Sequence, residues 1–204
     1  HLSVVGLRLV WELRGITAIG MEPDPPSKQQ ICVSRSFGRY VRSIAEMKEA
    51  VASYVTRAGE KLRHQKSSAG AVMVFMMTNR FRDEPQYANS TVLSLPAPSD
   101  VTDELIRYAL RGVEHVYRDG HRFNKAGVVL TSLVPSNQVQ TSLFDTADHE
   151  TSKRLMKALD SINARLGAGT LHYAASGLNP SWQTRFQRRS PRYTTRWNEL
   201  LTVR

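Results

Sequence analysis

The side chains best suited to chemistry in this sequence are basic ones that stand beside small hydroxyl residues. Ser34, Arg35 and Ser36 precede a glycine, in the run from Ser34 to Gly38. Arginine donates charge-assisted hydrogen bonds to phosphate oxygens, and small residues let a backbone approach them closely. The candidate DNA-contacting residues are Lys28, Ser34, Arg35, Ser36, Arg39, Arg42, Arg80, Arg122 and Lys125. An ordinary solvated surface explains the same charges equally well.

A second candidate site is a short peptide with two large apolar residues in a stretch otherwise typical of exposed chain. The peptide runs Gln140-Thr141-Ser142-Leu143-Phe144-Asp145. An extended peptide can place two apolar side chains in a partner's pocket while a nearby amide fixes the register. Gln140, Leu143, Phe144 and Asp145 are therefore candidate partner-binding residues. The alternative is that Leu143 and Phe144 fold back onto their own domain.

Catalytic chemistry is poorly supported. Five histidines are scattered without metal-ligand spacing, and the two acidic pairs sit beside a turn and in a first helical turn, where carboxylates commonly complement the helix dipole. These residues are His64, His115, His121, His149 and His172, with Asp83-Glu84 and Asp103-Glu104. We therefore predict no catalytic residue, metal site or cofactor in this sequence.

The composition narrows the class of partner and the cell compartment. Lys and Arg number 28 against 18 Asp and Glu, which gives a net charge of +10 and favours a polyanionic partner such as nucleic acid. Cys32 is the only cysteine, so a disulfide framework is excluded and a reducing, cytoplasmic setting is the default. No apolar run is long enough to span a bilayer, so we expect no membrane partner.

The patterns that must position these residues predict the order β-α-β-β-α-β over residues 30–134. Strands are expected at 30–37, 71–78, 89–95 and 126–134. One helix is expected after Ser43, which forms a capping box with Glu46, and a second after Asp100, which should cap it. Each helix carries one apolar stripe, so both can pack on the same face of a four-stranded sheet. The predicted fold class is α+β, with the other sheet face open.

Further elements are expected on both sides of this unit. A helix ending at Gly15 precedes it, and a stiff connector at 23–27 marks a domain boundary. A helix over 155–166 follows it, with a strand-like piece at 170–174, so the last region is expected to be a small α/β unit. The tail is dense in arginine, and its aromatic residues Trp182, Tyr193 and Trp197 are expected to form a small local core. Met73, Met76 and Met77 are expected to fill the core.

Several separate motifs resemble the C-terminal half of the UmuC branch of the Y-family translesion DNA polymerases. They are the runs from Ile31 to Gly38, from Thr78 to Phe81, from His121 to Val128 and from Ser190 to Trp197. The resemblance covers essentially the whole chain. It implies the end of a thumb domain at 1–22, a linker at 23–29, a little-finger DNA-binding domain at 30–136, a clamp-binding linker at 137–148 and a UmuC-type C-terminal region at 149–204.

The resemblance also implies partners. The little finger lays its sheet against template-primer DNA, Gln140 to Asp145 matches the peptide that binds the β sliding clamp, and the tail helps to contact the UmuD′ dimer and the RecA filament. The palm and fingers, which hold the family's catalytic carboxylates and its Mg²⁺, are not in this sequence. We therefore expect nucleotidyl transfer in the SOS response from the parent protein, and DNA grip and recruitment from these residues.

Two other functions fit parts of the same pattern. A stand-alone adaptor would bind clamp and DNA without catalysis, and palm carboxylates in the upstream open reading frame would exclude it. An RNA-binding ferredoxin-like domain would need stacking aromatic side chains on the open sheet face, where few candidates are found.

Overall fold

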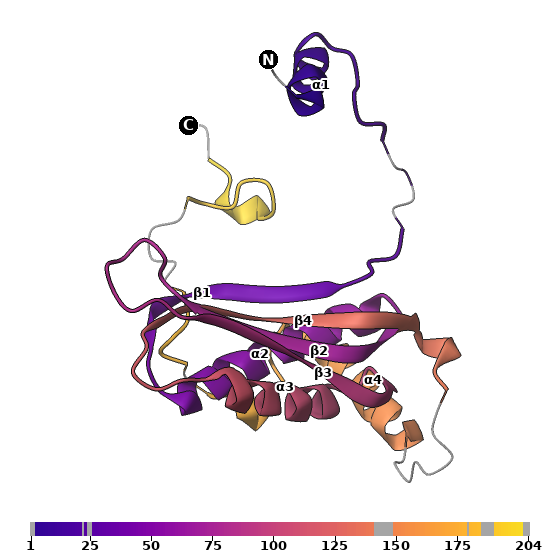
Figure 1. Ribbon diagram of the computed structural model, residues 1–204. Helices are drawn as coiled ribbons and strands as arrows, with labels where there is room; N and C mark the ends of the chain where they lie inside the picture. Colours follow the sequence, from indigo (N-terminus) through magenta and orange to yellow (C-terminus); the bar gives the residue numbers. More distant parts are fainter. Residues whose placement is uncertain are drawn as a thin grey trace.

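Four strands and two helices form the central unit of the computed structural model, which describes residues 3–21, 23, 26–140, 149–178, 180–184 and 190–201 (Figure 1). In chain order they are β1 (Ile31–Val41), α2 (Ile44–His64), β2 (Ser67–Thr78), β3 (Ala88–Ser99), α3 (Thr102–Val116) and β4 (Phe123–Pro135). All strand pairs are antiparallel, in the sheet order β1-β4-β2-β3. The predicted β-α-β-β-α-β order and the α+β class are confirmed.

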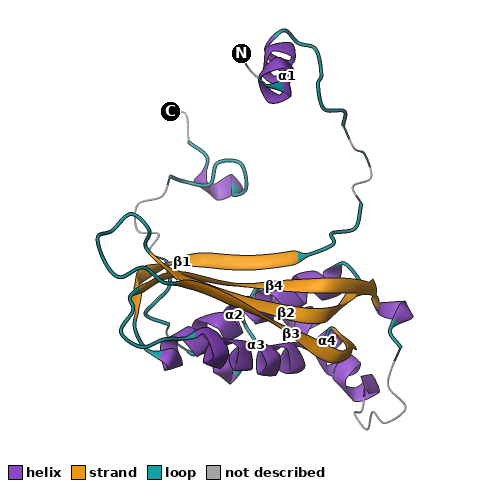
Figure 2. Cartoon of the chain, viewed as in Figure 1, coloured by secondary structure: helices purple, strands orange, loops and turns teal. Residues whose placement is uncertain are grey.

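Helices α2 and α3 lie side by side on one face of the sheet, and the other face is not covered by either helix (Figure 2). The apolar stripes account for this layering, because every third or fourth residue of each helix is buried against the strands. Val51, Val55, Leu62, Leu105 and Val113 from the helices are fully buried together with Val72, Val74, Phe123, Val128 and Leu130 from the strands. Burial of one such large side chain contributes about 1.5–3 kcal/mol.

The two helices begin in different ways. Ser43 caps α2 as predicted, since its hydroxyl accepts a hydrogen bond from the Glu46 N–H at 3.2 Å. The prediction that Asp100 caps α3 is wrong, because the N-cap is Val101, which makes no side-chain cap bond. The Ser99 hydroxyl instead accepts from the Val101 N–H at 3.2 Å, while the Asp100 carbonyl accepts from Arg63.

Strand β3 extends through Pro96 and Pro98, where the sequence pattern predicted its end. Two features explain the difference. β3 is an edge strand, so it can carry residues that lack an N–H donor. In addition, its register against β2 jumps from Ser94, opposite Ala71, to Ser99, opposite Ala69, so both prolines fall in an irregular stretch of the ladder.

The flanking helices agree with the sequence pattern, but the predicted strand at 170–174 does not form. α1 (Val4–Leu13) ends before Gly15 and stands apart from the sheet, and α4 (His149–Leu166) ends before Gly167 (Figure 1). After α4 the chain turns and enters the short 3-10 helix η2 (Ala174–Ser176). The Asn163 side chain accepts a hydrogen bond from the Leu171 N–H at 2.8 Å and donates one to the Leu171 carbonyl at 2.9 Å. The backbone at Leu171 is therefore paired with a side chain and not with a strand.

The C-terminal region packs against the central unit through Trp182. Its ring makes edge contacts with Phe37 and Tyr54, at centroid distances of 6.1 and 5.8 Å, and its carbonyl accepts from the Gly38 N–H at 2.9 Å. Trp182 is 4% exposed, whereas Trp197, in the 3-10 helix η3 (Trp197–Glu199), is 89% exposed. The predicted local core of tail aromatics is therefore wrong, because Trp182 belongs to the main core.

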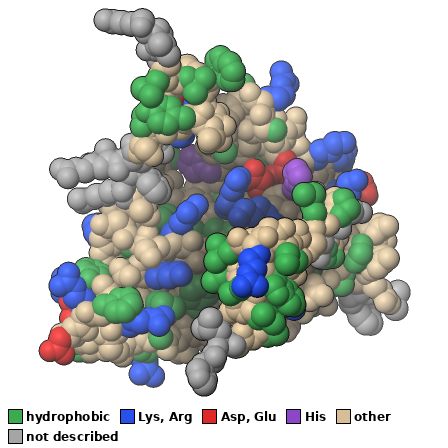
Figure 3. Space-filling model, turned by 90° about the horizontal axis from the view of Figure 1, so that it is seen from above, with side chains coloured by type: hydrophobic (Ala, Val, Ile, Leu, Met, Phe, Trp, Pro, Cys, Tyr) green, Lys and Arg blue, Asp and Glu red, His purple; other side chains and the backbone are tan. Residues whose placement is uncertain are grey.

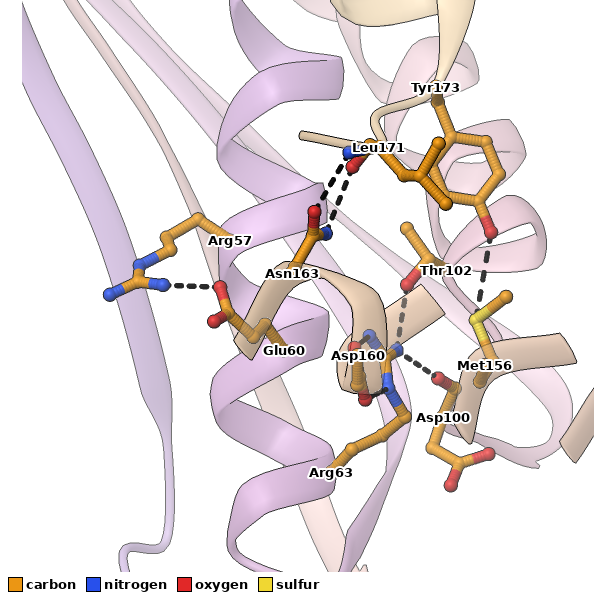
Figure 4. A network of polar contacts seen from close by, with 10 residues as sticks. All are labelled: Arg57, Glu60, Arg63, Asp100, Thr102, Met156, Asp160, Asn163, Leu171 and Tyr173. Atoms are coloured by element: carbon orange, nitrogen blue, oxygen red, sulfur yellow. Dashed lines mark hydrogen bonds and ion pairs between the residues drawn. The ribbon is translucent and has the colours of Figure 1, made fainter. Parts of the chain in front are cut away.

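Arg63 joins three helices at the far end of α2 (Figure 4). Its guanidinium forms a bidentate ion pair with Asp160 of α4, at 2.6 and 2.7 Å. The same group donates to the Thr102 hydroxyl at 2.7 Å and to the Asp100 carbonyl at 2.9 Å, at the start of α3. The Arg63 side chain is 10% exposed, so this junction is largely withdrawn from water.

Candidate nucleic-acid interface

The open sheet face is built from every second residue of the four strands. Residues directly opposite one another in antiparallel strands point to the same face. The pairing gives three rows across β1, β4, β2 and β3, namely Cys32-Val129-Met73-Val92, Ser34-Gly127-Phe75-Ser90 and Ser36-Lys125-Met77-Ala88. The residues between these rows on β2, Val74 and Met76, are fully buried under the helices.

The middle row depends on a glycine. A Cβ atom at Gly127 would lie 2.5 Å from the Phe75 ring and 2.5 Å from the Ser34 Cβ. The Phe75 ring therefore crosses the β4 backbone at a position that only a residue without a side chain permits.

Apolar and polar side chains share this face. Met73 and Met77 are half-buried on it, so the prediction that all three methionines fill the core is confirmed only for Met76. Phe75 is the one aromatic residue in the three rows and is already packed over Gly127. A surface with so little exposed aromatic area is poorly suited to stacking bases and better suited to contacts with a nucleic-acid backbone.

The structure places the four candidates nearest the centre of the sheet on two different faces. Ser34, Ser36 and Lys125 lie on the open face, and Lys125 has no ion-pair partner in the part of the chain that the structure describes. Arg35 lies on the opposite face, in a row with the buried Ala126 and Met76. Arg35 therefore does not share the open face with the two serines, since successive strand residues point to opposite faces, and its role in DNA contact stays a prediction.

Most of the remaining basic candidates gather at one end of the sheet. Strand β1 ends, β2 ends and β4 begins there, as the Val41–Phe123 and Thr78–Phe123 pairings show. This end carries Arg39, Arg42, Arg80, Arg122 and Lys125. Lys28 lies at the other end, before β1, where its carbonyl accepts from the Gln65 amide at 2.9 Å.

Two of these arginines already have partners within the protein. Arg39 forms an ion pair with Glu46 and donates to the Ser181 hydroxyl at 2.5 Å. Arg122 pairs with Glu84 at 3.0 Å and stands 4.4 Å above the Tyr40 ring. Arg42 and Arg80 are exposed. Figure 3 shows the molecule from above, on the side opposite α2 and α3, where Lys and Arg side chains lie among hydrophobic ones.

The candidate partner-binding peptide begins just after β4. The 3-10 helix η1 (Ser136–Gln138) follows the strand, and Gln140 is exposed. Leu143, Phe144 and Asp145 lie outside the described residues, so their role stays a prediction.

The described chain on either side of this peptide is anchored near the end of α2. Before the peptide, the Ser136 N–H donates to the Lys66 carbonyl at 2.9 Å. After it, α4 is held by the Asp160–Arg63 ion pair, only three residues away from Lys66 in the sequence. Sequence patterns missed this junction, because an arginine near the end of a helix more often complements the helix dipole.

The described residues contain neither a metal-binding cluster nor a membrane-spanning helix. No group of three or more His, Cys, Asp or Glu in that part of the chain is placed to hold a metal ion. No helix there is both long and apolar enough to cross a membrane.

Comparisons with known proteins agree with this architecture. The model of the impB/mucB/samB family C-terminal domain matches residues 28–143, and that of a domain of unknown function (DUF4113) matches residues 153–203. The chain is 40% identical over 206 residues to protein UmuC of Salmonella typhimurium, covering 100% of this chain and 49% of the relative. Protein MucB of Escherichia coli is 37% identical over 200 residues, covering 97% of this chain and 47% of the relative.

Solved structures give weaker likenesses. A Y-family DNA polymerase chimera matches 65% of this chain and 36% of its own, with a TM-score of 0.44 and 14% identity. A little finger domain of PolIV, in complex with a beta-clamp processivity factor, matches 57% of this chain with a TM-score of 0.38.

The chain spans about half the length of the curated relatives that it matches. The family model covers more than half of the chain, from before β1 to beyond η1, and the UmuC likeness continues through α4 and the tail. This chain therefore belongs to the impB/mucB/samB family, of which it contains the C-terminal domain.

Proposed function

We propose that this chain is the DNA-holding and clamp-docking C-terminal part of an error-prone, UmuC-like translesion DNA polymerase that acts in the SOS response. The observation that carries the proposal is the open sheet face. It presents Ser34, Ser36 and Lys125, which has no ion-pair partner among the described residues, and it adjoins the basic end of the sheet, in a chain that is 40% identical to UmuC along its whole length. The length of the relatives favours a polymerase part over a stand-alone adaptor.

The proposed DNA contact is made with the backbone of the template-primer duplex. Lys125 and the exposed Arg42 and Arg80 supply positive charge, while the small hydroxyls on β1 permit close approach to phosphates. Contacts of this kind carry no sequence information, which suits an enzyme that must hold DNA around any lesion. They also make binding strongly dependent on salt.

The proposed clamp contact is made by Gln140, Leu143, Phe144 and Asp145. The anchored positions of Ser136 and Asp160 support this role, because they fix the described chain on both sides of the peptide to the end of α2. Docking on a sliding clamp raises the effective concentration of the polymerase at a primer end without tight DNA binding.

The remaining roles belong to the parent protein. We propose that its nucleotidyl transfer, and the Mg²⁺ which that chemistry needs, reside in a part of the protein outside these 204 residues. The UmuD′ dimer and the RecA filament are proposed partners of the C-terminal region, in the bacterial cytoplasm.

A clamp pull-down tests the proposal. The Leu143→Ala/Phe144→Ala double variant should lose most of the clamp retained by the parent sequence, because two anchor side chains of such a peptide commonly supply most of its binding energy. Leu155→Ala, which removes an exposed leucine of α4, is the matched control and should retain the clamp. Equal retention by the double variant and the parent would show that the peptide assignment is wrong.

A further inference from the structure

The loop between β2 and β3, residues 79–87, presents an aromatic side chain to solvent. Phe81 in this loop is 88% exposed. The other exposed large apolar side chains of residues 31–135 are Ile44 at 38% and Val92 at 59%. Phe81 is therefore the most exposed of the three and the only aromatic one. The folding of the chain does not explain a phenylalanine at this position, because its ring is hardly buried.

The backbone at Phe81 is held in one shape by a hydrogen-bonded turn. The Asn79 carbonyl accepts from the Arg82 N–H at 3.2 Å, which closes a β-turn with Arg80 and Phe81 at its two central positions. The Asn79 side-chain oxygen also accepts from the Phe81 N–H at 3.1 Å. Asparagine is favoured in turns because its side chain makes this contact. The sequence Asn-Arg-Phe-Arg therefore places Phe81 at the tip of an ordered turn.

A second set of contacts fills the centre of the loop. The side-chain nitrogen of Gln86 lies 3.1, 2.9 and 3.0 Å from the carbonyl oxygens of Asn79, Arg82 and Glu84. The side-chain oxygen of Gln86 accepts from the Thr78 hydroxyl at 3.0 Å. None of these contacts uses the aromatic ring, so the loop keeps its shape without burying it. A side chain presented by a preformed loop loses little entropy when a partner binds it.

Arginines lie on both sides of the ring. Arg80 and Arg82, its neighbours in the sequence, are both exposed. The loop also contains Asp83 and Glu84, and the Glu84 carboxylate is paired with Arg122 at 3.0 Å. The loop and its ion-pair partner thus carry three arginines against two carboxylates, and two of those arginines flank the exposed ring.

The loop adjoins the proposed DNA face. It begins where β2 ends, opposite the start of β4, at the basic end of the sheet that carries Arg42 and Lys125. In Figure 1 it rises beyond the strands on the side away from α2 and α3. A duplex on the open face would therefore lie beside this loop. Phe75 on that face is already packed over Gly127, so Phe81 offers the more accessible ring.

The chemistry of the tip favours an unpaired DNA base as its ligand. A phenyl ring can stack on the flat face of any base, so such binding tolerates all sequences. Bases inside a duplex are stacked on one another and present only their edges in the grooves. The ring therefore needs a base outside the duplex, and the template strand ahead of a primer end supplies one. Guanidinium groups on both sides of the ring suit the phosphates that flank this base.

We propose that Phe81 stacks on an unpaired base of the template strand, with Arg80 and Arg82 contacting the neighbouring phosphates. The inference rests on the proposed DNA function and extends it from the duplex to the single strand beside it. Lys125 and the open face hold the duplex, and the β2–β3 loop holds the strand that is still to be copied. Stacking depends little on the identity of the base, which suits a protein that meets damaged templates.

The affinities of the 204-residue chain for three DNA probes test the proposal. The probes are a blunt duplex, the same duplex with a 5′ overhang of about six nucleotides, and a version whose overhang is abasic. The chain should bind the overhang probe more tightly than the abasic probe, which carries the same charge. Phe81→Ala should weaken binding of the overhang probe by about fivefold to a hundredfold, the range for one base–aromatic stack, and leave the blunt duplex unchanged.

Two further variants separate stacking from other contacts. Phe81→Trp should keep the preference for the overhang probe, whereas Phe81→Leu, which keeps apolar area without a ring, should lose it. Leu155→Ala, which removes an exposed leucine of α4, is the matched control and should bind all three probes as the parent does. Thermal unfolding verifies that each variant is folded.

Four results would overturn the proposal. Phe81→Ala could bind the overhang probe as tightly as the parent, or it could lose affinity for the blunt duplex equally, which would indicate a contact with the duplex. The parent could bind the overhang and abasic probes alike. Phe81→Ala could also lose clamp retention while its DNA binding is unchanged, which would assign the loop to a protein partner.

Lys125→Gln distinguishes failure of this proposal from failure of the proposed function. If Lys125→Gln weakens binding of the blunt duplex while Phe81→Ala leaves the overhang probe unaffected, only the stacking role is refuted. If the chain binds none of the three probes, the proposed DNA function and the stacking role are both wrong.

Discussion

The Arg63 junction should be a main anchor of α4 on the central unit. Arg63→Gln removes four hydrogen bonds of 2.6–2.9 Å, two of them to Asp160, and leaves that carboxylate without its partner. Breaking a buried ion pair costs about 3–5 kcal/mol. Because the Asp160 side chain is 30% exposed, water can take up part of the loss, and we expect about 3 kcal/mol.

Urea unfolding and hydrogen exchange measure this effect. The free energy of unfolding of Arg63→Gln should fall by about 3 kcal/mol, and the amides of α4 should exchange faster than those of the strands. Arg107→Gln is the control, because its pair with Asp103 is exposed and should contribute less than about 1 kcal/mol. A double-mutant cycle with Asp160→Asn should show coupling of at least about 1 kcal/mol. Equal losses in Arg63→Gln and Arg107→Gln would refute the junction.

Three further predictions follow from single positions. Gly127→Ala should lower stability by about 1–3 kcal/mol in thermal unfolding, because its Cβ collides with Phe75, whereas Gly20→Ala, with open space around it, should change little. Ser43→Ala should lose about 1 kcal/mol in the same assay through the lost cap of α2, and no loss would show that the cap is not needed. Burial raises the pKa of Tyr117 to about 12, so its stabilising contribution is full below pH 10 and is lost as the pH rises towards 12, and Tyr117→Phe should flatten that decline in unfolding free energy.

The central unit was predictable because each of its elements is specified by residues close together in the sequence. The stripe on each helix and the alternation along β1 and β4 each fix one face of one element, and layering follows from those faces. Ser43 could be recognised as a cap because its partner is three residues away. Asp100 fits the same rule, but α3 begins one residue later than expected, so that Val101 occupies the N-cap position and Asp100 precedes it.

The features that the sequence patterns did not predict depend on contacts between residues that are far apart in the chain. Arg63 and Asp160 are 97 residues apart, and no local sequence pattern near either residue predicts their pairing. Trp182 does not join the expected tail cluster, because it packs against Phe37 and Tyr54 in the main core. In the candidate DNA surface, charge alone grouped Arg35 with its serine neighbours, whereas the alternation of the strand separates them.

The salt dependence of duplex binding tests the central claim most directly. The affinity of the chain for a primer-template duplex is measured from low to moderate salt for the parent, for Lys125→Gln on the open face and for Arg111→Gln on the helix side. Lys125→Gln should reduce the slope of log K against log salt by about 0.9, the value of one phosphate contact, while Arg111→Gln leaves it unchanged. A slope that is insensitive to Lys125 but falls with Arg111 would contradict the assignment of the open sheet face to DNA.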